Sequence, residues 1–485
     1  MAADHLELGE IALTLQPPAR VSRILVHPLL VALALAGAFV APALARAQTP
    51  ATPPPQAAPE RAPTPPDSLS PDSLAARLAR AEAAIAALRQ QLATESQSTV
   101  HTRSRLQLEL TGRIYANFFL TLGRVNNVDV PGTALAPGEL ADDDVFGVTV
   151  RQSRVGAVVT VADVLGGTFV GDLDVDFFGG VQNGPGDRRL FPEPRMRTTS
   201  ARLRWSHTEL MVGMDVPLVS ELNPVSLAAS GIPLFSGTGN LWNWLGQVRL
   251  TQEIGRTSIG GDDAIRWALQ GAVMTPYAAA QAPGEPDAVD AGERSRRPAF
   301  EGRLRAKWGD SASSGGSDAS IGDGGGEIGV GVHGGWVADG TGGLITSRAV
   351  AMDARVSLTS RLELRGEAYT GQLLRGLGGG GIGQAFGRPA TGAALGPPIS
   401  DKAGWAQINA QVLTTLLAGA GCGLDVVDEA DRPTRRRNSV CAAHLLWRPS
   451  EPIVVGLEFR GITTEFDTGE TGRAKHLNLS FGFEL

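Results

Sequence analysis

Charged residues occupy every second position in several short stretches of this chain. In GTFVGDLDVDFFGG, for example, the aspartates at 172, 174 and 176 alternate with apolar residues. Successive side chains of a β-strand point to opposite faces, so each row of charges shares one face. Unpaired charges are costly in a dry core, whereas beside water they set a field that guides ions. We therefore expect a water-filled passage lined by Arg202, Arg204, Arg249, Arg266, Arg303, Arg305, Lys307, Asp172, Asp174 and Asp176.

The basic members of this set are the expected carriers of ion selectivity. The residues expected on the inward face lean slightly basic, although the whole chain has a net charge of −7. A basic constriction favours anions. The alternative is that the acidic and basic rows neutralise one another as a ladder across neighbouring strands.

The elements that must hold these rows are β-strands. From Leu106 onward apolar and polar residues alternate in sixteen segments. Most of them are close to the roughly 9–11 residues that a tilted strand needs to cross a membrane. The segments are 106–122, 148–161, 168–178, 195–205, 209–215, 242–254, 264–274, 299–308, 327–337, 349–358, 361–370, 404–413, 416–425, 438–448, 453–464 and 475–485.

Long and short connections alternate along this series. The connections 123–147 and 371–403 are long, whereas 206–208 and 359–360 are tight turns. Long loops on one side and short turns on the other are typical of bacterial outer-membrane barrels. The stretch 309–326 is long although it falls on the short side, which leaves the register beside it open. The expected fold is all-β: a transmembrane antiparallel β-barrel of about sixteen strands over residues 105–485.

The third long connection, 217–241, is moderately apolar. In a wide barrel such a loop can fold inward and narrow the passage. Glu221 and Asn223 are then the candidate constriction residues. An ordinary surface loop is the alternative.

Three parts precede the barrel. Residues 1–47 have basic residues, a long apolar run and an Ala-x-Ala ending, which predict a signal peptide. An uncleaved membrane anchor is the alternative. Residues 48–69 predict an extended Pro/Ala-rich linker. Residues 70–98 have apolar positions spaced by four and three, which predict a short periplasmic α-helical coiled coil or, alternatively, one amphipathic helix on another surface.

The remaining candidate residues carry little chemistry. Cys422 and Cys441 flank the connection 426–437 on neighbouring strands with the same parity, which predicts a disulfide in an oxidising compartment. His333 and His444 have no serine or carboxylate at a spacing that suggests a hydrolytic site. We expect no enzyme activity, no metal and no cofactor. The acidic balance argues against a nucleic-acid partner.

Several stretches resemble the DcaP-like trimeric outer-membrane porin family. They are RQSRVG (151–156), VLGGTFVGDLDVDFFGG (164–180), LNPVSLAASGIP (222–233), GNLWNW (239–244), GEAYTGQ (366–372) and GWAQIN (404–409). The resemblance covers most of 105–485 and includes a coiled helix ahead of the barrel. It implies a sixteen-stranded trimeric channel for small negatively charged solutes such as dicarboxylates. The low tyrosine count of 3 and the loop sequence GLGGGGIG depart from a typical porin.

These observations predict a porin for passive diffusion of small hydrophilic solutes, with a preference for small carboxylates. The expected partners are two more copies in a homotrimer, outer-membrane lipid and lipopolysaccharide, the barrel assembly machinery and small anionic solutes. The expected location is the outer membrane of a diderm bacterium, with the N-terminal helix in the periplasm. The alternative function is a structural protein that tethers this membrane to the cell wall through that helix.

Overall fold

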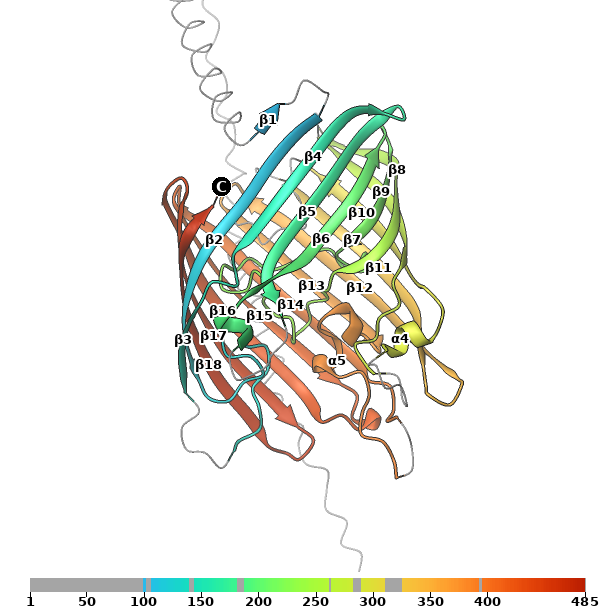
Figure 1. Ribbon diagram of the computed structural model, residues 1–485, viewed down its shortest axis with the longest axis vertical. Helices are drawn as coiled ribbons and strands as arrows, with labels where there is room; N and C mark the ends of the chain where they lie inside the picture. Colours follow the sequence, from blue (N-terminus) through green and yellow to red (C-terminus); the bar gives the residue numbers. More distant parts are fainter. Residues whose placement is uncertain are drawn as a thin grey trace, which may run out of the picture. The chain divides into compact units, whose positions relative to one another are not determined.

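The strands of the computed structural model form one closed antiparallel sheet (Figure 1). The structure describes residues 99–101, 106–138, 144–180, 187–260, 263–281, 289–309, 325–391 and 395–484. The chain divides into two compact units, Met1–Ala83 and Ala84–Leu485, and the barrel belongs to the second. The expected signal peptide, linker and coiled coil lie outside the described residues.

The strands are named in chain order. They are β1 (Thr99–His101), β2 (Leu106–Leu122), β3 (Val145–Thr149), β4 (Arg154–Val164), β5 (Gly167–Gly179), β6 (Glu193–Arg204), β7 (Thr208–Asp215), β8 (Leu245–Gly260), β9 (Asp263–Met274), β10 (Ala299–Trp308), β11 (Gly326–Ala338), β12 (Leu344–Thr359), β13 (Leu362–Gln372), β14 (Ser400–Leu413), β15 (Leu416–Val427), β16 (Arg435–Ser450), β17 (Ile453–Phe466) and β18 (Thr471–Glu484). Short helices in the connections are α3 (Asp187–Leu190), α4 (Ala291–Arg294), η1 (Arg375–Leu377), α5 (Gly380–Gly383) and η2 (Glu429–Asp431).

The strands fill sixteen positions in the wall, which confirms the predicted barrel. β3 and β4 both pair with β2 and share one position, while β1 only adds a short pairing to the start of β2. β18 pairs with β2, and β9 with β10, so the sixteen positions of the described wall close on themselves. A closed sheet leaves no unpaired backbone groups facing lipid.

The second predicted strand, 148–161, is wrong as one continuous element, because the wall is interrupted between β3 and β4. Neighbouring strand residues point to opposite faces, yet Arg151 and Gln152 both bind groups in the barrel interior. Arg151 Nε donates to Asp129 at 2.7 Å, and Gln152 Nε2 donates to the carbonyl of Ala228 at 3.2 Å. The interruption allows both side chains to turn inward.

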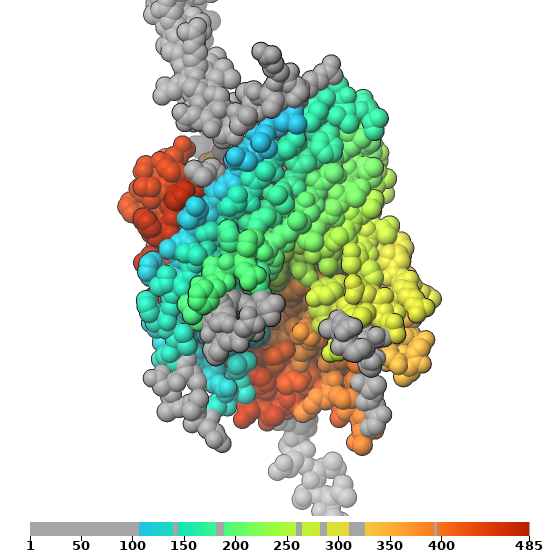
Figure 2. All heavy atoms as spheres, in the orientation of Figure 1, coloured from blue at the N-terminus to red at the C-terminus, as the bar shows by residue number. Residues whose placement is uncertain are grey.

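Apolar residues cover the outer face of the wall. In β18 the side chains of Leu477, Leu479 and Phe481 are exposed, whereas Asn478 and Ser480 are buried inside. Figure 2 shows the strands from β2 to β7 side by side across one face of this wall. Apolar residues outside and polar residues inside are the reverse of a soluble barrel and fit a strand wall in lipid. Among the described residues, no helix has the length and apolar character needed to cross a membrane.

The connections follow the predicted alternation of long and short. Residues 216–244 join β7 to β8 and residues 373–399 join β13 to β14, whereas only two residues join β14 to β15. The sequence left the register beside residues 309–326 open. In the structure β10 and β11 are neighbours and pair directly, with Trp308 opposite Gly326. Residues 310–324 between them lie outside the described residues. In Figure 1, α4 and α5 lie at the end of the barrel opposite to β1.

Candidate functional site

The connection 216–244, here called the lumen loop, passes through the interior of the barrel. Nearly all its residues from Val216 to Leu241 are buried. Its backbone binds inward-facing side chains around the wall: Val219 N donates to Glu301 of β10 at 2.9 Å, and Val225 N donates to Gln407 of β14 at 2.8 Å. On the other side, Ser226 Oγ binds Glu458 of β17 at 2.5 Å. The third long connection therefore folds inward and is not a surface loop.

Glycines in the wall leave room for the lumen loop. A side chain added at Gly331 of β11 would start 2.2 Å from the carbonyl oxygen of Val219. Gly239 of the loop has a φ of +104°, which favours glycine, and its added Cβ would lie 2.4 Å from the backbone nitrogen of Gly404. The loop backbone thus lies directly on the inner face of the wall at these two points.

We expect Gly331→Val to displace the lumen loop without unfolding the barrel, because the wall pairing of β11 does not need a glycine. The expected result is a folded protein whose single-channel conductance differs from that of the native protein. Gly334→Val in the same strand is the matched control, since a side chain added there meets nothing within 4 Å. Identical conductance for Gly331→Val and the native protein would contradict the close contact.

The predicted constriction residue Glu221 lies among arginines. Its carboxylate accepts a hydrogen bond from Arg249 at 2.6 Å and lies 3.9 Å from both Arg303 and Arg305. Burial raises the pKa of this carboxyl, but the arginines, Arg249 first, outweigh burial and leave the pKa below its ordinary value. Glu221 therefore stays ionised at neutral pH and ties the lumen loop to β8 and β10.

The second predicted loop residue, Asn223, supports the loop through its polar groups. Its carbonyl accepts a hydrogen bond from Arg365 Nη1 at 3.0 Å, and its side-chain oxygen accepts one from Asn240 at 3.2 Å. Both contacts hold the loop in shape against β13.

The predicted residue Arg303 is fully buried and lies in an ion-pair network. Its guanidinium forms two hydrogen bonds with Asp353 of β12, at 2.5 and 2.7 Å, and lies 3.8 Å from Glu327 of β11. Parallel N–H···O bonds of this kind are among the stronger ion pairs in proteins. Since Arg303 has no exposed side-chain surface, it supports the site and does not meet passing solutes.

Asp353→Asn should therefore destabilise the barrel by about 3–5 kcal/mol. This is the usual cost of removing one partner of a buried ion pair, because the other charge is left buried and uncompensated. Glu327 and Glu221 still lie within 4 Å of Arg303, which favours the lower end of this range. The measurement is urea unfolding in lipid vesicles. Glu209→Gln is the matched control, because it breaks the half-exposed pair between Arg204 and Glu209 and should cost only about 0–1 kcal/mol. Equal losses in the two variants would contradict the buried role of Asp353.

The three predicted aspartates form the ladder that the sequence left as an alternative. Asp176 binds Arg195 at 2.6 Å, and Asp174 binds Arg154. Arg197 lies 3.5 Å from both Asp174 and Asp176. Asp172 lies 3.5 Å from Arg202, which also binds Asp215 at 2.8 Å. These carboxylates are neutralised by neighbouring strands.

Sequence reasoning missed Arg195 and Arg197. The pairing of β5 with β6 shifts between Asp174 and Val175, so the parity that places Arg202 inside does not continue to the start of β6. The Arg-Met-Arg alternation at 195–197 was the available signal, and Met196 is indeed exposed on the outer face. A bulge cannot be located from alternation alone.

Two predicted basic residues lack an ion pair among the described residues, namely Arg266 of β9 and Lys307 of β10. They face each other directly in the pairing of these strands. The same row continues to Arg256 of β8 on one side, and through Glu327 to Arg355 of β12 on the other. Arg305, which is about a quarter exposed, lies one inward position away. This set of five is here called the basic row. Arg256 pairs with Glu253 at 2.9 Å and Arg305 lies 3.9 Å from Glu221 of the lumen loop, so the positive balance of the row rests on Arg266 and Lys307.

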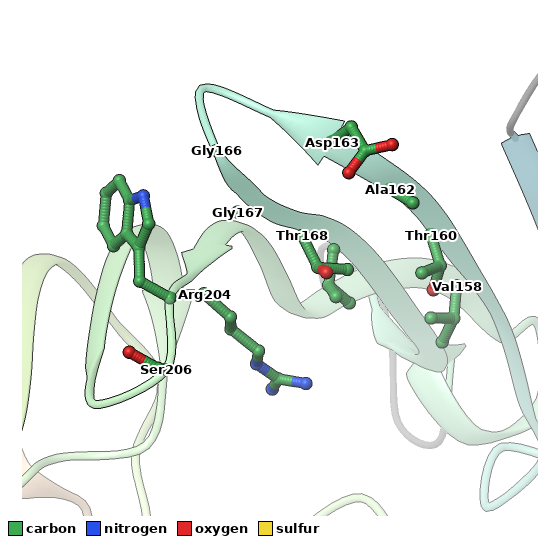
Figure 3. A pocket seen from close by; sticks show the side chains of 11 residues that line it. Val158, Thr160, Ala162, Asp163, Gly166, Gly167, Thr168, Arg204 and Ser206 are labelled. Atoms are coloured by element: carbon green, nitrogen blue, oxygen red, sulfur yellow. The ribbon is translucent and has the colours of Figure 1, made fainter.

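Arg204 lies apart from the basic row, beside a hollow of about 650 Å³ at the turns that follow β4 and β6 (Figure 3). Thr160, Thr168 and Val158 line the same hollow. Arg204 is half exposed and pairs with Glu209. The hollow is formed by the short turns and does not include the lumen loop.

His333 belongs to a hydrogen-bonded chain whose carboxylate and serine are not at a suggestive spacing in the sequence. His333 Nδ1 lies 2.9 Å from Glu301, and Nε2 lies 3.1 Å from Ser347 Oγ. The residues come from β10, β11 and β12, so their sequence spacing gave no signal. Ser347 Oγ also lies 3.2 Å from the carbonyl of Leu373, and Glu301 accepts from the lumen loop. The chain therefore connects the lumen loop to the β13–β14 connection.

Cys422 and Cys441 are direct partners in the pairing of β15 with β16. Their Cα atoms are 4.1 Å apart and their sulfurs are joined as a disulfide. The disulfide links β15 to β16, whereas the basic row lies on β8 to β12.

Comparisons with known proteins address the fold. No family model matches the chain, and no curated protein matches it in sequence. Among solved structures, the outer membrane channel DcaP of Acinetobacter baumannii is similar over 80% of this chain and 100% of its own, with 12% identity and a TM-score of 0.59. An anion-selective porin from Comamonas acidovorans matches over 78% of this chain and 100% of its own, with 12% identity and a TM-score of 0.47.

The first of these similarities, with a TM-score of 0.59, is a similarity of overall fold, which in this structure is the closed antiparallel sheet. At 12% identity this similarity shows a shared fold and does not indicate the substrate. The chain therefore has the fold of the outer-membrane porins.

Proposed function

We propose that this protein is an outer-membrane porin through which small hydrophilic solutes diffuse passively, with a preference for anions such as small carboxylates. The observation that carries the proposal is a closed barrel with a polar interior that a folded-in loop narrows. A structural wall has no need of such an interior. In an open passage, the loop and the residues opposite it decide what crosses.

The anion preference rests on the basic row. Arg266 and Lys307 carry positive charge without an ion pair among the described residues, while the aspartates of β5 are paired with arginines. Unpaired guanidinium and ammonium groups beside water lower the energy of a passing anion and raise that of a cation.

We propose a channel and no hydrolytic role for the chain of Glu301, His333 and Ser347. Ser347 is buried at 6% exposure, and its hydroxyl also contacts a backbone carbonyl. A nucleophile needs access to a substrate carbonyl and a second set of donors for the oxyanion. The contacts of this chain instead hold two loops together.

We also propose that three copies assemble in the outer membrane, with the predicted coiled helix of residues 70–98 in the periplasm. The apolar outer face supports membrane insertion, since large side chains such as Phe146, Val155 and Phe481 are exposed on it.

Solute flux into proteoliposomes tests the proposed function. Full-length mature protein is reconstituted, and uptake of succinate, of a neutral sugar and of a diamine of similar size is compared. We expect succinate to enter fastest and the diamine slowest. Uptake equal to that of empty vesicles for all three solutes would contradict the porin proposal, and faster entry of the diamine would contradict the anion preference.

A further inference from the structure

Two aspartates at one end of the wall face the same point inside the barrel. Asp401 is the second residue of β14, and Asp425 lies near the end of β15. Asp401 pairs with Val427 and Ala403 pairs with Asp425, so the two carboxylates are diagonal neighbours on one face. Both are buried, with exposures of 3% and 0%.

Each aspartate holds the connection 373–399 through one oxygen. Gly381 N donates to Asp401 Oδ2 at 2.7 Å, and Ile382 N donates to Asp425 Oδ2 at 2.9 Å. Both donors have left-handed backbone angles, with φ of +63° and +54°. A β-branched residue rarely adopts this conformation. The contacts with the two carboxylates therefore hold Ile382 in a backbone shape that it would not choose alone.

The second oxygen of each carboxylate has no hydrogen-bond partner among the described residues. A third buried oxygen, the hydroxyl of Tyr369 in β13, lies beside the two aspartates, and its own proton can be donated to the carboxylate of Asp401. Tyr369 is 6% exposed. Three buried oxygens from three neighbouring strands thus lie close together, and the second oxygen of Asp425 has no donor.

No arginine, lysine or histidine of the described residues forms an ion pair with either aspartate, and the two carboxylates are diagonal neighbours on one face. Two buried carboxylates of like charge repel each other and have lost their hydration, at a cost of several kcal/mol. Either a cation or a shared proton must offset this cost. A divalent cation neutralises both carboxylates, whereas one shared proton leaves one of the two buried charges in place.

We propose that Asp401, Asp425 and Tyr369 form a cation site that takes a hard divalent ion such as Ca²⁺. Oxygen ligands with two formal negative charges suit this ion, and Ca²⁺ tolerates irregular geometry and completes its shell with water. Bound there, it fastens the connection 373–399 to β14 and β15. No motif in the sequence indicates this site, because its three residues come from different strands.

Terbium luminescence tests the site in the refolded full-length protein in detergent. Tb³⁺ substitutes for Ca²⁺ and emits when a neighbouring aromatic ring, here Tyr369, absorbs light and transfers the energy. We expect saturable emission that Ca²⁺ suppresses by competition. Asp425→Asn keeps an oxygen acceptor for Ile382 N but removes a charge, and should weaken Tb³⁺ binding by more than about tenfold.

Two further variants keep the test decisive. Asp428→Asn is the matched control, since Asp428 is an exposed residue just beyond β15 and should leave the emission unchanged. Asp401→Asn repeats the loss on the other strand if Asp425→Asn fails to fold. Emission that is absent in the native protein, or equal in all folded variants, would overturn the proposal. An infrared band of a protonated carboxylic acid at neutral pH that disappears in Asp425→Asn would show a shared proton instead.

Discussion

Replacing residues 219–240 by a short glycine–serine linker is expected to raise single-channel conductance by about twofold or more, because the lumen loop occupies part of the water-filled section. The loop binds inward-facing groups on β10, β14 and β17, which lie around the wall, so it crosses the interior. The measurement is the conductance step in a planar bilayer. Heat-modifiable migration on a gel confirms that the shortened barrel folds.

Removing the loop also removes Glu221 and leaves Arg249 and Arg303 with fewer acidic neighbours. We therefore expect the shortened protein to favour anions more strongly than the native protein as its conductance rises. Glu221→Gln separates the two effects, since it removes the charge and keeps the loop. A folded, shortened protein with native conductance would contradict the idea that this loop narrows the passage.

Reversing two charges of the basic row, with Arg266→Glu and Lys307→Glu together, is expected to change the ion preference from anions to cations. Two unit charges 4 Å apart interact by about 1 kcal/mol in bulk water, so each reversal changes the energy of a contacting anion by about 2 kcal/mol. A difference of about 1.4 kcal/mol is tenfold in an equilibrium ratio. The effect is large enough to reverse the sign of the reversal potential under a KCl gradient.

The control for this double variant is Arg361→Glu. Arg361 is exposed in the short turn between β12 and β13 and lies outside the basic row. It should leave the reversal potential close to that of the native protein. Equal shifts for Arg361→Glu and the double variant would mean that net charge, and not the basic row, sets the preference.

The barrel could be predicted because membrane strands leave a pattern of period two. Lipid faces one side of every strand and the interior the other, so residues such as Leu477 and Asn478 alternate regardless of what the loops do. The alternation of long and short connections also predicted on which side of the membrane each loop lies. Both patterns are local in the sequence, and the structure agrees with both.

The partners of the charged residues could not be predicted, because they depend on register and on loop paths. Arg303 faces inward as its parity indicates, but its burial under the lumen loop and its pairing with Asp353 follow from contacts between distant segments. Local irregularities had the same effect. The interruption before β4 turns Gln152 inward, and the bulge opposite Asp174 brings Arg197 inside, where simple alternation placed neither.

The same argument explains the start of β8. The expected strand begins at residue 242, but the amides of Trp242 and Asn243 both donate to the carbonyl of Leu377, at 2.9 and 3.0 Å. These residues are therefore used to join the lumen loop to the β13–β14 connection, and the strand begins at Leu245. A loop contact so far away in sequence has no local signature.

The reversal potential of the full-length mature protein in a planar bilayer under a KCl gradient tests the central claim most directly. We expect conductance in steps of three, with a reversal potential that favours chloride. Current that favours potassium would contradict the assignment of selectivity to the basic row. A folded, inserted protein that passes no current would contradict the porin itself and would favour a structural tether to the cell wall.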